Sequence, residues 1–137
     1  MLLGLGNDIV SVKRIKNSYQ RFGKRLENRI YTTAEIKLIW ERGSPCFKTL
    51  SSRGAAKEAF VKALGTGFRK GIFWKDISVL NNLNGKPELV IRGQAKVCLN
   101  SILPADTSPI IHISISDEKE IVNAIVIIVA RDLNHFN

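Results

Sequence analysis

Two neighbouring stretches near the C-terminal end set the strongest limit on the fold. Residues 111–116 alternate strictly between apolar and polar side chains, which is the pattern of a β-strand with one buried face. Residues 121–130 form a largely apolar run that predicts a second strand, and the charged residues 117–120 between them predict a turn. The sequence therefore predicts a pair of antiparallel strands in this part of the chain.

The rest of the chain adds one early strand, a hairpin and several helices. Residues 3–10 predict a strand of the same sheet, and residues 76–80 and 88–91 predict a hairpin around a turn at residues 81–85. Helical patterns occupy residues 12–30, a short segment opened by a capping box at Thr32 and Glu35, residues 52–64 and residues 94–103. We expect a single α+β domain over residues 1–137, with an antiparallel sheet packed against helices.

The helix expected after residue 50 carries an unusual mixture of small and charged residues. Ser51 or Ser52 can cap its N-terminus, and Gly65 and Gly67 can end it. The face that would be buried is mostly small: Ala55, Ala56, Ala59, Phe60, Ala63 and Leu64. The charged residues lie away from the centre of this face: Arg53, Lys57, Glu58 and Lys62. Spacing alone leaves two interpretations open, a solvated face with ordinary Glu–Lys pairs or a single carboxylate surrounded by cations that bind a ligand.

Charge and cysteine content narrow the class of protein. The net charge is +9, and residues 1–75 carry 16 Lys or Arg against 5 Asp or Glu, which indicates an anionic partner. A one-sided basic stripe along residues 13–29 is opposed only by Glu27. Cys46 and Cys98 are far apart and lack metal-ligand spacing, so we interpret them as reduced structural thiols of a cytoplasmic protein. No run approaches the length of a membrane span.

Few residues are placed for catalysis, and the familiar motifs of hydrolases, zinc proteases and nucleotide-binding loops are absent. Asp8 lies among apolar residues, where a carboxylate needs a partner or a metal, although a helix-cap or turn role is equally open. His112 alternates with Ser114 and Ser116 on one strand face, whereas His135 falls in the terminal tail. A lone histidine on a strand is usually structural.

Four segments together resemble one enzyme family, holo-acyl carrier protein synthase, the small phosphopantetheinyl transferases. Residues 4–15 are similar to the family's G-x-G-x-D-I-V-x-x-x-R-I opening, and residues 53–67 match its R-x-A-x-K-E-A-x-x-K-A-x-G-T-G helix. Gly85-Lys86-Pro87 matches a G-K-P hairpin, and residues 112–116 match an H-x-S-x-S-like strand. The four segments occur in order and cover nearly the whole chain.

The resemblance implies a reaction and a set of roles. It implies Mg²⁺-dependent transfer of phosphopantetheine from coenzyme A to a serine of apo-acyl carrier protein, with release of adenosine 3',5'-bisphosphate, in support of fatty acid biosynthesis. Asp8 and Glu58 would bind Mg²⁺, Lys62 would meet the diphosphate, and Glu58 would take the serine proton directly or through a water on the metal. Coenzyme A contacts are implied for Arg53, Lys57, Lys62, Gly65, Gly85, Lys86, Pro87, His112 and Ser114.

The resemblance also implies partners. Arg14, Arg21 and Arg25 would dock the acidic carrier protein, and members of this size resemble half of a longer transferase and assemble as homotrimers with active sites between subunits. The chain departs from the family at Gly54, where an aromatic residue is common, at Asp117, which often is a second histidine, and mildly at Asn7. The alternative is a basic module that binds nucleic acid through residues 13–29, which would not need Asp8 and Glu58. We expect no nucleic-acid partner and no membrane span.

Overall fold

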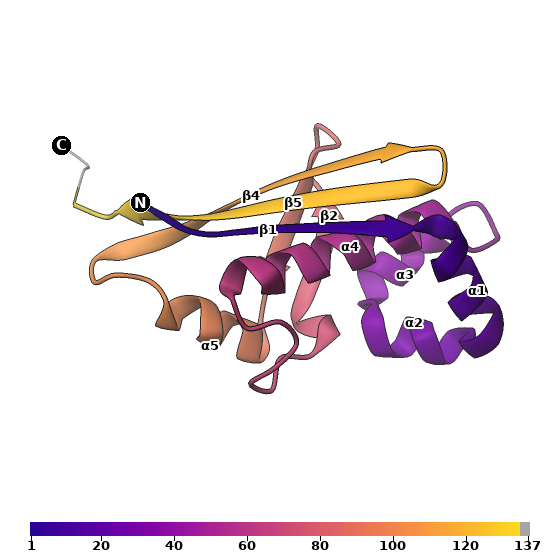
Figure 1. Ribbon diagram of the computed structural model, residues 1–137, viewed down its shortest axis with the longest axis horizontal. Coiled ribbons are helices and arrows are strands. Elements are labelled where there is room, and N and C mark those ends of the chain that lie inside the picture. Colours follow the sequence, from indigo (N-terminus) through magenta and orange to yellow (C-terminus); the bar gives the residue numbers. More distant parts are fainter. Residues whose placement is uncertain (135–137) are drawn as a thin grey trace.

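A three-stranded antiparallel sheet runs along the length of the molecule in the computed structural model, which describes residues 1–134 (Figure 1). The sheet has the order β1-β5-β4, with β1 at Leu2–Ser11, β4 at Thr107–Glu118 and β5 at Ile121–Asp132. The predicted strand pair and its early partner are therefore confirmed, with longer strands and a tighter turn than expected. His135 lies outside the described residues.

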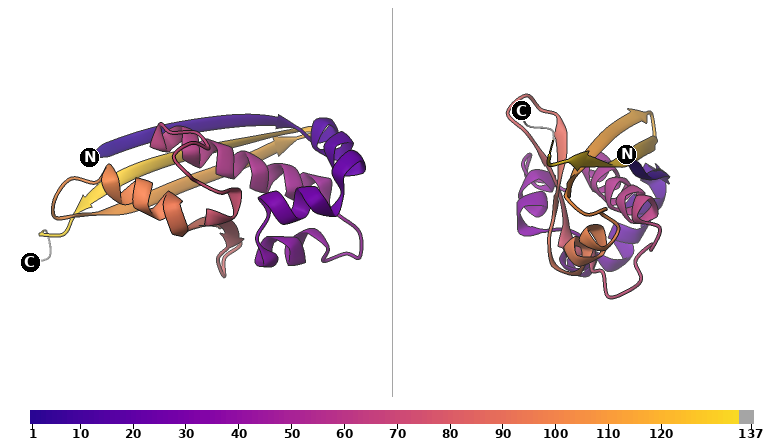
Figure 2. Two further views of the ribbon diagram at one scale, coloured as in Figure 1. Left: turned by 90° about the horizontal axis from the view of Figure 1, so that it is seen from below. Right: turned by 90° about the vertical axis from the view of Figure 1, so that its left-hand side faces the viewer.

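The long helix α4, Phe47–Leu64, packs against the inner face of β1 and β5 (Figures 1 and 2). Gly4 and Gly6 make this close approach possible, because a Cβ atom at either position would overlap the backbone carbonyl of Ala63 or Ala59. The small buried residues expected on this helix lie in the core with apolar side chains of β5: Ala55, Ala56, Ala59, Ala63, Val122, Ala124, Val126 and Ile128. Close packing of α4 on β1 also brings the charged residues of the two elements together.

The start of α4 differs from the prediction, whereas its end does not. Gly65 follows the last residue with a φ of 82°, the left-handed conformation that ends helices. The helix begins five residues before Ser52, after Cys46. Ser51 and Ser52 lie inside it, and their hydroxyls donate back to the carbonyls of Phe47 (2.7 Å) and Thr49 (3.0 Å). Serines used in this way resemble caps in sequence, which explains the error.

Three short helices pack against one end of α4: α1 at Val12–Phe22, α2 at Lys24–Ile30 and α3 at Thr33–Ile39 (Figure 1). The single helix expected over residues 12–30 is broken at Gly23, which has a φ of 54°. Ser11 caps α1 and Thr32 forms the predicted capping box with Glu35. Tyr31, Ile39 and Leu50 form a second small core between these helices and α4.

The other side of α4 is covered by the smaller elements. The predicted hairpin is β2 (Ile77–Asn81) and β3 (Pro87–Ile91), preceded by the short 3-10 helix η1 (Trp74–Asp76) and followed by α5 (Gly93–Ser101). These strands form a separate two-stranded sheet. Within residues 1–134, no helix combines the length and apolar character that a bilayer crossing would require.

Candidate active site

Asp8 faces α4 from the middle of β1. Strand alternation places it on the same side as Gly4 and Gly6, and its side chain is only 15% exposed. Lys62, on the last turn of α4, donates from Nζ to Asp8 Oδ1 and to the Asn7 carbonyl oxygen, both at 3.0 Å. The aspartate is thus a paired strand residue and not a helix cap or turn residue.

Glu58 lies one helical turn before Lys62 and lines the same cleft as Asp8. Burial raises the pKa of the Glu58 carboxyl, the nearby Asp8 carboxylate raises it further, and Lys62 acts in the opposite direction. The two acidic residues, fifty positions apart in sequence, therefore converge within one chain. Lys62 pairs with Asp8 and not with Glu58 as the ordinary solvated-face interpretation required.

The cleft around these residues has a volume of about 400 Å³. Its charged end holds Asp8, Glu58 and Lys62, and Arg14 of α1 also lines the cleft. The remaining wall is mostly apolar and aromatic: Ile9, Val10, Ile15, Ile30, Tyr31, Gly54, Ala55 and Trp74, together with Ser11 and Ser18. Sequence reasoning did not assign Tyr31 or Trp74 to the site, because nothing in their local patterns indicates which cavity they border.

The donor set suits one kind of metal. Within residues 1–134 no group of three or more His, Cys, Asp or Glu side chains is arranged to hold a metal ion. A pair of carboxylates is enough for Mg²⁺, which takes one or two protein carboxylates and completes its octahedron with water and phosphate oxygens. It does not suit a structural zinc ion, which takes four protein ligands. Asp8 and Glu58 therefore fit Mg²⁺.

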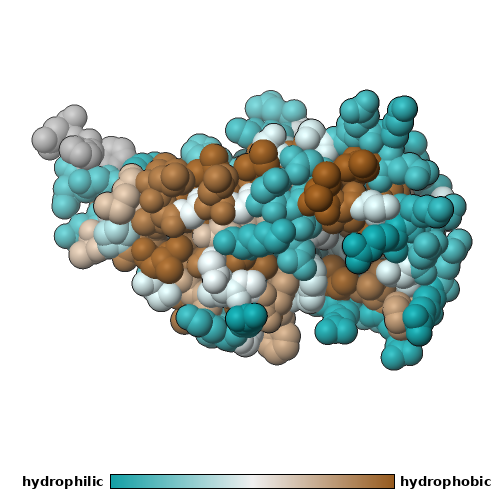
Figure 3. Space-filling view, in the orientation of Figure 1, coloured by the Kyte–Doolittle hydropathy of each residue, from teal (hydrophilic) through white to brown (hydrophobic). Residues whose placement is uncertain are grey.

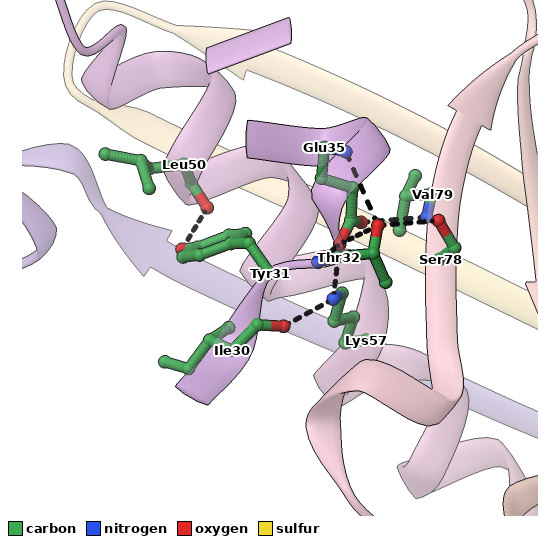
Figure 4. Close-up of polar contacts among 8 residues, drawn as sticks. All are labelled: Ile30, Tyr31, Thr32, Glu35, Leu50, Lys57, Ser78 and Val79. Atoms are coloured by element: carbon green, nitrogen blue, oxygen red, sulfur yellow. Dashed lines mark hydrogen bonds and ion pairs between the residues drawn. The ribbon is translucent and has the colours of Figure 1, made fainter. Parts of the chain in front are cut away.

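Lys57 was expected on the exposed part of α4 as a coenzyme A contact, and the structure contradicts this. Its side chain has no exposed surface, and its Nζ donates to Glu35 Oε1 at 2.6 Å and to the Ile30 carbonyl oxygen (Figure 4). The other Glu35 oxygen accepts the backbone N–H of Val79 at 2.8 Å. This ammonium is therefore shielded from any ligand, and it ties α4 to α2, α3 and β2.

Arg53 borders a different cavity, a groove of about 290 Å³ between the start of α4, the hairpin and β4. The residue is only 7% exposed, and its Nη2 donates to Asn81 Oδ1 at 3.3 Å. Pro87 lines the same groove, whereas Gly85 and Lys86 are exposed in the hairpin turn. Of the expected coenzyme A contacts, Arg53 and Pro87 are therefore brought together, and Lys62 lies in the first cleft.

Comparison with known proteins agrees with this geometry. Residues 4–113 match the profile of the 4'-phosphopantetheinyl transferase superfamily. The chain is 44% identical over 131 residues to holo-[acyl-carrier-protein] synthase of Erythrobacter litoralis, covering 96% of this chain and 98% of that one. It is 42% identical to the enzyme of the same name from Rhizobium leguminosarum, covering 95% and 96%.

Solved structures give the same result. The crystal structure of holo-[acyl-carrier-protein] synthase from Neisseria meningitidis superposes with a TM-score of 0.82 at 36% identity, covering 94% of this chain and 99% of that chain. The Bacillus anthracis enzyme, solved in complex with coenzyme A (3',5'-ADP), gives 0.72 at 32% identity, with 93% and 96% covered. The chain belongs to the holo-acyl carrier protein synthase family. The expected fold class is likewise confirmed.

Two residues of the family's strand motif lie apart from the cleft. His112 and Ser114 are exposed on β4, on the sheet face opposite α4. Their neighbours on β5 are Ile127 and Ile125, whose register partners on β1 are Leu5 and Asn7. A single chain of this synthase therefore does not bring His112 or Ser114 close to Asp8 and Glu58.

The three arginines expected to dock a carrier protein are all exposed: Arg14 and Arg21 on α1 and Arg25 on α2. Glu27, the one acidic residue in this stretch, is 4% exposed and points inward. It accepts hydrogen bonds from the Tyr19 hydroxyl (3.0 Å) and Trp40 Nε1 (2.6 Å). The surface of these two helices is therefore more strongly positive than the sequence suggested.

Proposed function

We propose that this chain is a holo-[acyl-carrier-protein] synthase, which transfers phosphopantetheine from coenzyme A to a serine hydroxyl of apo-acyl carrier protein in support of fatty acid biosynthesis. The serine oxygen bonds to the phosphorus that carries pantetheine, the bridging P–O bond breaks, and adenosine 3',5'-bisphosphate leaves. The observation that carries the proposal is the convergence of Asp8, Glu58 and Lys62 at one cleft. Family membership and the names of the relatives support it.

Asp8 and Glu58 are the residues that would hold Mg²⁺, because they supply two hard oxygen donors at the charged end of the cleft. When bound, the ion neutralises diphosphate charge and so favours departure of the leaving group. Burial of Glu58 and the nearby Asp8 carboxylate both oppose ionisation of Glu58. A cation in addition to Lys62 would therefore stabilise the two carboxylates.

Lys62 and Glu58 have distinct roles in this proposal. The half-exposed ammonium of Lys62 is free to turn from Asp8 to a diphosphate oxygen and stabilise charge on the departing phosphate. Glu58 takes the proton of the attacking serine, directly or through a water, because it is the second carboxylate of the cleft while Asp8 is paired with Lys62. No activated serine or cysteine is required because the nucleophile belongs to the carrier protein.

We further propose a homotrimer in which each active site is completed by a neighbouring chain. Large apolar side chains are exposed on β1 and β5, among them Leu5 at 61%, Ile9 at 67% and Ile121 at 50%. Figure 3 shows apolar residues gathered along β1, interrupted by hydrophilic ones. A second copy of the chain packed on this sheet face would cover these side chains. It would also place His112 and Ser114 of the first chain beside coenzyme A in the cleft of the second. A solution mass equal to one chain, measured by analytical ultracentrifugation, would exclude this arrangement.

The proposed compartment is the cytoplasm, where phosphopantetheine transfer to carrier protein serves fatty acid synthesis. The free thiols Cys46 and Cys98 suit a reducing compartment. No nucleic-acid partner is proposed, since α1 and α2 border the cleft that holds the acidic pair.

The central test is incubation with coenzyme A, Mg²⁺ and apo-carrier protein, followed by intact mass measurement of the carrier. We expect the mass of one phosphopantetheine to be added, and chelation of divalent ions to prevent it. Glu58→Gln should lower the rate roughly 10²- to 10⁴-fold, while Glu41→Gln, which removes an exposed charge outside the cleft, should not. Transfer at the wild-type rate by Glu58→Gln would contradict the assigned role.

Carrier docking is tested by reversing one charge. Arg14→Glu should raise KM for the carrier protein roughly tenfold and KM for coenzyme A far less, because surface charges mainly steer an acidic partner. Lys96→Glu on α5 makes the same charge change away from the two helices and serves as the control. Equal changes in both KM values for Arg14→Glu would count against docking.

A further inference from the structure

Cys46 was expected to be a structural thiol, and the structure gives it a different setting. The residue is exposed, whereas Cys98 is buried in the core. Cys46 is the N-cap of α4, an eighteen-residue helix, and its carbonyl oxygen accepts the N–H of Leu50 at 3.0 Å. Its thiol lies where the positive end of the helix dipole favours a thiolate.

The surroundings of the sulfur favour the charged form. Partial burial by itself would raise the pKa of the Cys46 thiol, but the net direction is downward. The Thr49 hydroxyl, the backbone N–H groups of Thr49 and Lys48, and the charge of Arg42 outweigh the burial, although the thiol makes no capping hydrogen bond of its own. Thiolate character and exposure together are the conditions for reaction with a disulfide.

A second, independent observation lies in the groove that Cys46 shares with Arg53. Arg53 is only 7% exposed, and although its Nη2 donates to Asn81, its buried Nε–H has no acceptor among residues 1–134. A cationic side chain with one donor unsatisfied favours an anionic ligand beside it. Lys48 adds a second cation at the rim, partly offset by Asp117, which it contacts at 3.5 Å.

We propose that Cys46 is a site of reversible S-thiolation, at which an anionic low-molecular-weight disulfide forms a mixed disulfide within this groove. The Cys46 thiolate attacks one sulfur of R–S–S–R, the S–S bond of the reagent breaks, and a Cys46–S–S–R bond forms. The other half leaves as R–S⁻ and takes up the proton that Cys46 lost. Attack by another thiol on the mixed disulfide reverses the step. Glutathione disulfide and the disulfide of coenzyme A share this chemistry, with carboxylates in the first and phosphates in the second.

The adduct also has a consequence that rests on the proposed function. Arg53 and Pro87 line the groove and are candidate coenzyme A contacts, so a group attached to Cys46 occupies their space. S-thiolation would then inhibit phosphopantetheine transfer and couple it to the thiol redox state of the cell.

The covalent step is tested by mass spectrometry of the full-length protein, without reference to transfer. The probes are glutathione disulfide, coenzyme A disulfide and the cationic disulfide cystamine, each rate being divided by the rate of an uncharged thiol, 2-mercaptoethanol, with the same reagent. We expect one adduct on the Cys46 peptide, none in Cys46→Ser, and normalised rates about tenfold higher for the anionic disulfides than for cystamine. The faster of the two anionic reagents identifies whether carboxylates or phosphates suit the groove better.

Substitution of Arg53 or Lys48 tests whether the cations of the groove, and not the thiol alone, set the preference for anionic reagents. Arg53→Gln should remove most of the preference for anionic reagents while Cys46 still reacts. Lys48→Gln, at a half-exposed position that tolerates change, keeps the test available if Arg53→Gln does not fold. An adduct on Cys98, or equal normalised rates for anionic and cationic disulfides, would overturn the proposal.

The inhibitory consequence has its own readout. After complete modification, transfer from coenzyme A to apo-carrier protein should fall at least about tenfold and return with dithiothreitol, whereas Cys46→Ser should keep its own untreated rate. Full modification with undiminished transfer would overturn the inhibition alone. Absence of transfer in the untreated protein would contradict the proposed function, and the mass measurement would still decide the modification.

Discussion

Two lysines of α4 each pair with an acid from another element, and the two pairs differ in their exposure to solvent. Lys57 and Glu35 are both fully buried and 2.6 Å apart, whereas Lys62 is 49% exposed, Asp8 is 15% exposed and they lie 3.0 Å apart. The Glu35 oxygens also accept the backbone N–H groups of Val79 in β2 and of Thr32, the N-cap of α3, so the core pair has no place for another partner. Lys62 opens onto a cleft. The sequence motif contains both lysines, but exposure separates the one that fixes the fold from the one that can meet a substrate.

Removing the core lysine should have the largest effect on stability. Lys57→Met leaves the Glu35 carboxylate buried without its cation, and we expect unfolding free energy to fall by about 3–5 kcal/mol. Urea titration at one fixed protein concentration measures it, since any assembly would make the midpoint depend on concentration. The double variant Lys57→Met/Glu35→Gln should recover part of the loss. A cost below about 1 kcal/mol for Lys57→Met would show that the pair is not a core element.

The cleft lysine should behave in the opposite way. Lys62→Ala should change unfolding free energy by at most about 1 kcal/mol, because its pair is open to solvent. Transfer to carrier protein should fall roughly a hundredfold, the scale for loss of one group that stabilises developing charge. Single-turnover rates and urea titrations on the same preparation give both values. Equal losses of stability in Lys62→Ala and Lys57→Met would remove the distinction between the pairs.

Features that depend on nearby residues in the chain were predicted from the sequence, whereas those that depend on distant residues were not. Periodicity predicted the strands of the main sheet, and the Thr32–Glu35 capping box was also confirmed, because both depend on neighbours in the chain. The acidic residues that meet at the cleft were selected by family resemblance, and the structure brings them together. The burial of Lys57 was missed, because its partners Glu35 and Ile30 come from elements 22 and 27 residues away.

Glu27 and Cys46 show the same limit. Glu27 was counted as the lone acid of the basic stripe along residues 13–29, yet its side chain points inward to Tyr19 and Trp40. Local spacing does not reveal this orientation. Cys46 was interpreted as structural because cysteine spacing gave no sign of a metal site or a redox pair. Its position as the N-cap of α4 was not foreseen, because the start of this helix was predicted several residues too late.

The smallest expected effect concerns the pH dependence of stability at Glu58. Burial and the Asp8 carboxylate raise its pKa in the folded chain above the unfolded value, so between the two values the folded state binds more protons than the unfolded state. Stability contributed by protonated Glu58 is therefore fully present below the unfolded pKa and is lost as pH rises through the folded pKa. Glu58→Gln, which stays neutral, should be slightly more stable than wild type at pH 7 and equal to it near pH 4. Urea midpoints across this range measure the difference, with Glu41→Gln as the exposed control. A Glu58→Gln variant less stable than wild type at pH 7 would mean that Lys62 outweighs Asp8 and burial, and that the acid is held for the fold as Glu35 is.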